Sequence, residues 1–190
     1  MSDKTIEGEA FDKLDCSTGR LPAKEFDECT FTNCDLKSVD LSYVSFLDCE
    51  FVNCDLSNAK INNTAFKEVK FSQCKLLGLH FGQSNPFLLS LGFEQCVLNL
   101  SSFYSLKLKG IEFDECSAKE VDFAGADLSE STFKDCDLLG ALFENTNLQS
   151  ADFRTSYNYD IDPETNRIKK AKFSKERLSG LLSKYDIVIE

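Results

Sequence analysis

The stretches FDECTFTNCDL from Phe26, FLDCEFVNCDL from Phe46 and FKEVKFSQCKL from Phe66 follow one pattern, and each begins twenty residues after the previous one. Within each stretch a large apolar residue returns at every fifth position, so a five-residue period lies inside the twenty-residue one. An α-helix repeats at about 3.6 residues and a β-strand at about 2, and neither produces this spacing. A coil with four equivalent sides does produce it, because each side then takes five residues.

The spacing holds over most of the chain, with one interruption. Every fifth residue is apolar over residues 11–81, and again over residues 88–153 after the register slips by two. The slip falls at GQSNPF, residues 82–87, where Pro86 has no amide to donate and its polar neighbours favour a turn. We therefore predict a two-residue insertion there in an otherwise continuous coil.

Residues twenty apart in such a coil stack in columns at the spacing of paired strands, about 4.8 Å. Two columns exchange aromatic and aliphatic residues at the insertion, which keeps the filled volume of each coil about constant. The predicted columns are Phe11, Phe31, Phe51, Phe71, Phe93, Phe113, Phe133 and Phe153; Leu21, Leu41, Ile61, Phe81, Phe103, Phe123 and Phe143; and Phe26, Phe46, Phe66, Leu88, Leu108, Leu128 and Leu148. The sequence thus predicts an all-β fold, a right-handed quadrilateral parallel β-helix, over residues 1–157. Roughly seven coils give it a length on the order of 35 Å.

Residues 158–190 are expected to form a separate capping and dimerisation segment, because the five-residue spacing fails from Asn158. Ser174 can cap a short C-terminal α-helix over residues 175–185. Apolar residues repeat there at helical spacing, and a short apolar strand follows. This surface can cover the last coil, form a two-fold interface with a second copy, or do both. The residues concerned are Leu178, Leu181, Leu182, Tyr185, Ile187 and Ile189.

The charge of the chain is strongly acidic and unevenly spread. The formal net charge is -11, of which residues 87–160 carry -8, whereas residues 161–190 carry +2. Such a chain is repelled by phosphates, so we expect no direct nucleic-acid or membrane partner. No apolar run is long enough to span a bilayer, and the first ten residues are too polar for a secretory signal, so a cytoplasmic location is expected.

The nine cysteines follow the same spacing. Eight stand two residues before an apolar residue of the five-residue spacing, and six of them form a column of their own: Cys34, Cys54, Cys74, Cys96, Cys116 and Cys136. Small apolar filler, as buried free thiols, is the favoured interpretation, because parallel side chains do not reach disulfide geometry. A soft-metal site is the alternative, and it needs convergent ligands. We expect no cofactor.

The sequence nominates no catalytic residue. His80 is the only histidine and has no obvious partner, and no nucleophile motif, phosphate loop or metal motif is present. We therefore expect a protein that is not an enzyme.

Outward positions beside the columns carry two acidic groups, which either keep a β-rod soluble or bind a partner. The first contains Glu25, Asp27, Glu28, Asp48 and Glu68. The second contains Glu94, Glu112, Asp114, Glu115, Asp135 and Asp152. Phe87, Leu89, Leu77, Val97 and Leu139 are expected to be exposed apolar residues.

The repeated unit, a small residue followed by Asp and Leu, resembles the pentapeptide-repeat family over about residues 6–157, as in Cys34-Asp35-Leu36, Cys54-Asp55-Leu56 and Ala126-Asp127-Leu128. The ending, ADF at Ala151 followed by a helix and IVIE, also resembles the Qnr-type quinolone-resistance proteins of bacteria. That resemblance implies a homodimer joined through the C-terminal segment. It also implies a DNA mimic that binds DNA gyrase or topoisomerase IV and protects it from quinolones, with the second acidic group in place of phosphates.

The sequence lacks the two long projecting loops of many Qnr-type proteins and has only the short insertion near Pro86. A second function therefore stays open, an interaction scaffold for an unrelated partner. In that case the apolar patch near Phe87 and Leu89 would carry the contact.

Overall fold

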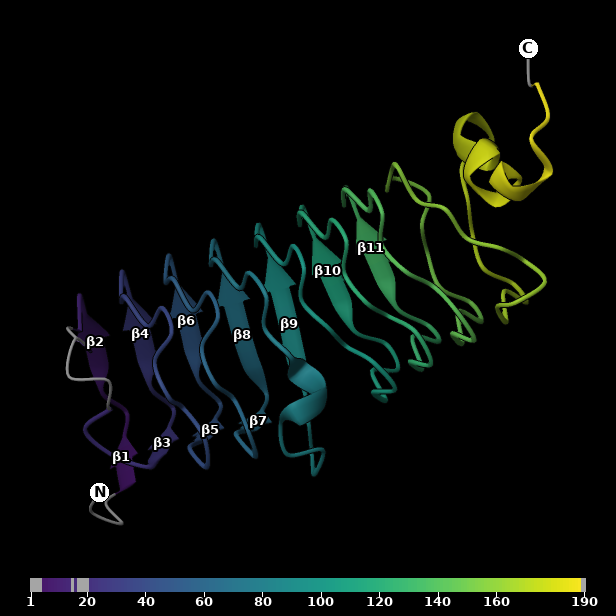
Figure 1. Ribbon diagram of the computed structural model, residues 1–190. Helices are drawn as coiled ribbons and strands as arrows, with labels where there is room; N and C mark the ends of the chain where they lie inside the picture. Colours follow the sequence, from purple (N-terminus) through teal and green to yellow (C-terminus); the bar gives the residue numbers. More distant parts are fainter. Residues whose placement is uncertain (1–4, 15, 17–20, 189–190) are drawn as a thin grey trace.

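The computed structural model describes residues 5–14, 16 and 21–188. The chain forms a right-handed quadrilateral β-helix, seen as a long rod in Figure 1, and this confirms the predicted fold class. Every strand pair is parallel, and short strands build a four-stranded sheet of order β1-β3-β5-β7 and a seven-stranded sheet of order β11-β10-β9-β8-β6-β4-β2. The strands of the first sheet are β1 (Thr5–Glu7), β3 (Glu25–Asp27), β5 (Ser45–Leu47) and β7 (Ala65–Lys67). Those of the second are β2 (Ala10–Asp12), β4 (Thr30–Thr32), β6 (Glu50–Val52), β8 (Val69–Ser72), β9 (Leu91–Glu94), β10 (Glu112–Asp114) and β11 (Thr132–Lys134).

The pairing register follows the predicted columns. Phe31 pairs with Phe51 at a separation of twenty, and their rings stack with centroids 4.7 Å apart. Across the insertion Phe71 pairs with Phe93, and these rings still stack at 5.6 Å. The long phenylalanine column therefore passes through the insertion unbroken, and its interior is filled at every level from Phe31 to Phe153.

The corners of the coil depend on residues in the left-handed region. At Asn33 and Asn53 the φ angles are 54° and 53°, and the same conformation recurs at almost every fifth residue. Asparagine tolerates this region better than most residues, which accounts for the polar residues at these corners. The Asn53 side-chain amide also donates to Asn33 Oδ1 at 2.7 Å, so the corner residues of successive coils bind one another.

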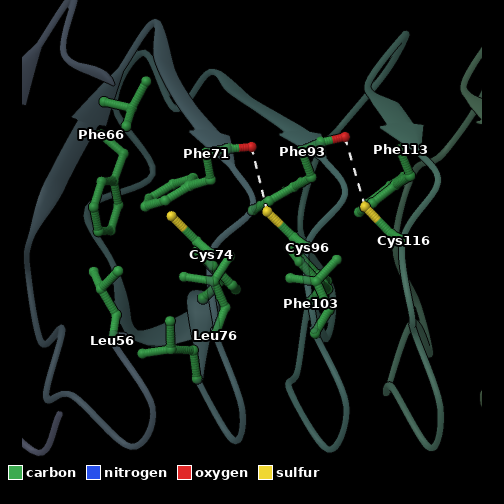
Figure 2. Close-up of a cluster of buried hydrophobic side chains, with 14 of the residues drawn as sticks. Leu56, Phe66, Phe71, Cys74, Leu76, Phe93, Cys96, Phe103, Phe113 and Cys116 are labelled. Carbon is green, nitrogen blue, oxygen red and sulfur yellow. Dashed lines mark hydrogen bonds between the residues drawn. The ribbon is translucent and has the colours of Figure 1, made fainter. Parts of the chain in front are cut away.

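Where the small residue two positions before an inward-facing residue is cysteine or threonine, it supplies a hydrogen-bond donor inside the rod. Cys96 Sγ lies 3.3 Å from the carbonyl oxygen of Phe71, and Cys116 Sγ lies 3.6 Å from that of Phe93 (Figure 2). Thr64 Oγ1 donates in the same way to the Leu41 carbonyl at 2.8 Å. A thiol or a short hydroxyl side chain therefore both fills the position and satisfies a buried carbonyl.

The insertion lies slightly later in the chain than the periodicity indicated. Ala65 pairs with Asn85 at a separation of twenty, whereas Val69 pairs with Leu91 at twenty-two, so the two extra residues fall between the partners. The short 3-10 helix η1 (Phe81–Gln83) precedes them. The prediction that Leu88 belongs to a core column is wrong, because it is 64% exposed.

Leu89 packs against the core instead of Leu88 and is only partly exposed, which corrects its expected place on the surface. Leu88 has a φ of 57°, so the chain reverses there and directs the next side chain inward. The five-residue period fixes the phase on both sides of an insertion but not the conformation within it.

Parallel pairing continues beyond the expected end of the coil at residue 157. Asn147 forms a bridge with Arg167 and Asp152 one with Lys172. The ring of Phe173 stacks on Phe153 with centroids 5.4 Å apart. The repeat spacing of the sequence thus ends before the coil does.

The expected C-terminal helix is present as two 3-10 helices rather than one α-helix. These are η2 (Lys175–Leu181), which is broken by non-helical angles at Arg177, and η3 (Ser183–Tyr185). Ser174 precedes η2 but makes no capping side-chain hydrogen bond, contrary to expectation. The segment is fixed to the coil at Gly180, whose carbonyl accepts from Ile161 N at 2.8 Å and whose Cα lies so close to Tyr159 that a side chain would collide.

Candidate functional site

The second acidic group lies along one face of the rod, on β9, β10 and β11 and the edge beside them. Glu112 and Asp114 flank Phe113 on β10 and point outward, and Asp114 is in register with Glu94 on β9. Glu115 and Asp135 occupy successive corners, both with positive φ. Asp152 stands opposite Thr132 in the following coil. The six carboxylates thus lie on successive coils, four on this face and two on the corner beside it.

Two of the six carboxylates are neutralised by cations. Lys134 Nζ lies 2.9 Å from Asp114 Oδ2. Arg154 donates to Asp152 through Nε at 3.0 Å and Nη2 at 2.7 Å, and Lys172 lies 3.7 Å away. The Arg154 hydrogen bond holds the pKa of Asp152 below its ordinary value despite partial burial.

Sequence reasoning missed these ion pairs, although their signal was present. Lys134 is twenty residues after Asp114, and Lys172 is twenty residues after Asp152, which is the separation of stacked neighbours in the coil. A search for opposite charges at this separation would have found the pairs of Lys134 with Asp114 and of Lys172 with Asp152.

The remaining four carboxylates have no cationic partner within the described residues. They are Glu94, Glu112, Glu115 and Asp135. Glu115 accepts a hydrogen bond from Gln95 Nε2 at 2.9 Å, which holds one carboxylate in place. A shallow hollow of about 250 Å³ lies between Glu94, Glu112 and Asp114, and Lys70 also lines it. The site that the structure offers is therefore an open surface on which four carboxylates remain without an ion pair among the described residues.

The first acidic group is more dispersed. Glu28, Asp48 and Glu68 stack along one edge of the four-stranded sheet, all exposed and all with positive φ. Glu25 lies on β3 and accepts from Thr5 Oγ1 at 2.8 Å, and Asp27 lies at the other end of the same strand. These residues form a second negative surface, on the coils that precede the insertion.

The apolar residues of the C-terminal segment divide into two sets. Leu181 packs against the core and so covers the last coil, and Leu182 is half-buried. Leu178, Tyr185 and Ile187 are 42%, 50% and 55% exposed. Ile189, the last residue expected at the interface, lies outside the described residues. Capping therefore uses only part of the apolar surface.

Other apolar side chains are exposed along the rod. Val97 and Leu139 lie on the surface as expected, whereas Leu77 is half-buried. Phe87 is 66% exposed, and Lys67 Nζ lies 5.7 Å from the centre of its ring. The insertion thus presents Phe87 and Leu88 side by side.

All nine cysteines are buried, and the eight from Cys29 to Cys136 are free thiols. Burial raises the pKa of Cys49 to about 11, so this thiol is protonated at neutral pH. No group of three or more metal-binding side chains converges among residues 5–14, 16 and 21–188, and no described helix has the length and apolar character to cross a membrane.

Comparison with known proteins relates the coil to one family. A family model for a pentapeptide repeat region matches residues 24–89, and a model for eight copies of pentapeptide repeats matches residues 96–135 and 122–156. The gap between the two matches follows the insertion. No curated protein sequence matches the chain.

The full-length structure of QnrB1 shares the fold at low identity, and other solved structures resemble the chain more weakly. The full-length structure of QnrB1, described as a plasmid-mediated fluoroquinolone resistance protein, is 17% identical, with a TM-score of 0.57 over 97% of this chain and 100% of that one. A trypsin-treated QnrB1 variant is 23% identical, with a TM-score of 0.48 over 98% and 97% of the two chains. HetL, a pentapeptide repeat protein from the cyanobacterium Nostoc involved in heterocyst differentiation regulation, is 14% identical, with a TM-score of 0.34 over 90% and 85%.

Proposed function

We propose that this chain, which belongs to the pentapeptide-repeat proteins, acts as a mimic of duplex DNA. In this proposal it is not an enzyme and its role is Qnr-like. Its partner in this proposal is a bacterial type II topoisomerase, DNA gyrase or topoisomerase IV, and its binding protects that enzyme from quinolones. The observation that carries the proposal is the surface of four unpaired carboxylates, Glu94, Glu112, Glu115 and Asp135, held on a rigid rod.

The magnitude of the charge supports electrostatic attraction of moderate strength. A net charge of -11 over a rod on the order of 35 Å gives about one charge per 3 Å of axis, compared with about one per 1.7 Å for duplex DNA. A basic DNA-binding groove would attract such a rod, although less strongly than DNA itself. Binding should therefore weaken as salt increases.

The proposal includes a homodimer joined through the C-terminal segments. Leu178, Tyr185 and Ile187 give each copy an apolar surface at one end of the rod. Burying this surface in a two-fold contact would double the length of the acidic rod. Light scattering should give twice the chain mass for the wild type and the single-chain mass for Ile187→Asp.

The free buried thiols suit a reducing compartment, so the cytoplasm is the proposed location. This is also where a topoisomerase partner would be found.

The test of topoisomerase binding is supercoiling of relaxed plasmid by purified gyrase, with and without a quinolone, as the protein is titrated. Charge reversal of Glu94, Glu112 and Glu115 to lysine should abolish any inhibition of supercoiling or rescue from the drug. The matched control reverses Glu28, Asp48 and Glu68, which changes the net charge equally at another place and should retain the effect. No effect of the wild-type protein in either assay would contradict the proposal.

The alternative is an interaction scaffold with an unrelated partner and no topoisomerase activity. The exposure of Phe87 and Leu88 on the insertion favours it. Binding through these residues should be insensitive to salt and lost in Leu88→Asp, which distinguishes it from binding through the acidic face.

A further inference from the structure

The ladder of backbone hydrogen bonds is interrupted on one side of the rod, between the coil that carries the insertion and the next coil. One coil further along, the same side is closed: Leu108 N donates to Asp127 O, and Asp127 N donates to Leu106 O, both at 2.8 Å. Among the described residues, no backbone hydrogen bond joins 83–90 to 104–110.

The interruption leaves three groups of an edge strand without backbone partners. Asp127 N and O and Ser129 O all bond to the preceding coil. The equivalent groups twenty residues earlier are Lys107 N, Lys107 O and Lys109 O, and no described backbone group pairs with them. One donor and two acceptors thus lie along a strand edge in the spacing that another strand would match.

A groove lies at this edge. A hollow of about 270 Å³ is lined by residues 89–92 on one side and 107–112 on the other. It shares Gly92 and Glu112 with the hollow of about 250 Å³ on the acidic face, so the two join around the corner of the rod. Gly92 forms the common floor, because a Cβ there would have its nearest neighbour, Lys70 Cγ, at 3.9 Å.

The side chains around the groove differ from the rest of the acidic rod. Lys107 and Lys109 line one wall together with Glu112, and Lys109 Nζ lies 3.1 Å from Glu130 Oε1, whereas Lys107 forms no ion pair among the described residues. Phe87 and Leu88 directly precede the lining residues 89–92 in the insertion and are about two-thirds exposed, and Lys67 lies over the Phe87 ring. Two lysines and two large apolar side chains beside an unpaired edge are complementary to a chain with acidic and apolar residues.

We propose that this groove binds an extended segment of a partner protein, which pairs with the backbone at Lys107 and Lys109 as an added strand. The segment alternates apolar and acidic side chains, with the acidic ones facing Lys107 and Lys109 and the apolar ones contacting Phe87 and Leu88. Main-chain hydrogen bonds supply affinity in this mode of recognition, and the alternating side chains supply specificity. The inference is independent of topoisomerase binding and goes beyond it.

The test uses a fluorescently labelled nine-residue peptide of alternating leucine and glutamate, titrated with the full chain and followed by anisotropy. We expect saturable binding. N-methylation of the peptide amides that face the edge keeps the side chains but removes the ladder, and should weaken binding by about tenfold or more. Replacing the glutamates by lysines should weaken it similarly.

Variants of the protein test the location. Gly92→Ile fills the floor of the groove while favouring the strand, so the thermal unfolding curve should be kept and peptide binding lost. Lys107→Glu combined with Lys109→Glu should reduce affinity, whereas the control Lys60→Glu, on another side of the rod, should not.

The proposal is overturned if the peptide does not bind saturably, if the N-methylated peptide binds equally well, or if Gly92→Ile binds as the wild type does.

Discussion

The side of the coil formed by residues 83–92 and the same side one coil later, residues 104–112, differ in their surface more than in their core. In both, phenylalanine rings remain stacked at the centre, at 5.6 Å for Phe71 and Phe93 and at 5.3 Å for Phe93 and Phe113. The later side is hydrogen-bonded to the coil that follows it, whereas among the described residues no backbone hydrogen bond joins 83–90 to 104–110.

The difference shows that core packing and the surface ladder are separable in this fold. Two extra residues between Asn85 and Leu91 are absorbed by exposing Leu88, so the phenylalanine column is kept. The ladder is lost because the backbone of 86–90 no longer follows that of 107–110. A coil can therefore gain a binding edge without losing its core.

The largest effect should come from the core. Phe113 is fully buried between Phe93 and Phe133, so Phe113→Ala should lower the free energy of unfolding by about 3 to 5 kcal/mol through the cavity it leaves. Phe87→Ala, at an exposed ring, should change it by less than about 0.5 kcal/mol. Urea denaturation measures both, and similar losses for the two would break the comparison.

Closing the interrupted ladder is the second prediction. Deleting Pro86 and Phe87 restores the twenty-residue spacing and puts Leu88 opposite Phe66 in the column. About three ladder bonds can then form, so the free energy of unfolding should rise by about 2 kcal/mol. Urea denaturation of the deletion variant checks this.

The control for the deletion removes Ser129 and Glu130 from a closed coil, which shifts every later column and should destabilise the rod. If the two deletions lowered the stability equally, this would contradict the interruption of the backbone hydrogen bonds between residues 83–90 and 104–110.

Two corner glycines compare the open and closed sides directly. Gly110 and Gly125 have φ angles of 75° and 69°. A Cβ at Gly110 meets nothing within 4 Å, whereas at Gly125 it lies 2.9 Å from Ser105 Oγ. Gly110→Ala should cost about 1 kcal/mol for its backbone conformation, and Gly125→Ala more, as measured by thermal unfolding. A larger cost at Gly110 would mean that the gap is closed in solution.

The smallest effect concerns Asp152, beyond the open coil. Its pKa is lowered in the folded chain, chiefly by the Arg154 hydrogen bond, so its contribution is present above the unfolded value of about 3.9 and is lost as pH falls through the folded pKa. Asp152→Asn should therefore cost about 0.5 kcal/mol at pH 7, because the exposed Arg154 is screened by solvent.

The cost of Asp152→Asn should disappear near pH 2, which denaturation at the two pH values checks. Glu112→Gln is the control, since no cation among the described residues forms an ion pair with this carboxylate. A pH-independent cost for Asp152→Asn would contradict the assigned ion pair.

The regular part of the fold could be predicted from the sequence because the five-residue period determines both which residues are buried and which residues stack. Phe93 was correctly placed above Phe71 for this reason. Leu88 was placed wrongly, because any two-residue insertion between Asn85 and Leu91 leaves the same phase on both sides. Periodicity cannot say which of the intervening residues turns inward.

The sequence indicated on which face the acidic residues of the candidate site lie, but not that cations neutralise some of them. Glu94 and Glu112 lie on the expected face, whereas Asp114 is neutralised by Lys134, one coil away. The C-terminal helix was expected as an α-helix from its apolar spacing. The structure has a more tightly wound 3-10 helix there, in which Gly180 lies against Tyr159, a contact that sequence spacing does not reveal.

Hydrogen exchange of two amides tests the interrupted ladder most directly. Asp127 N donates to Leu106 O and should be protected, whereas the equivalent amide of Lys107 has no backbone acceptor among the described residues and should exchange rapidly. The amide hydrogen of Lys107 should exchange at least about a hundredfold faster than that of Asp127 in the native rod. Equal protection of the two amides would mean that the ladder is closed and would contradict both the open edge and the groove built on it.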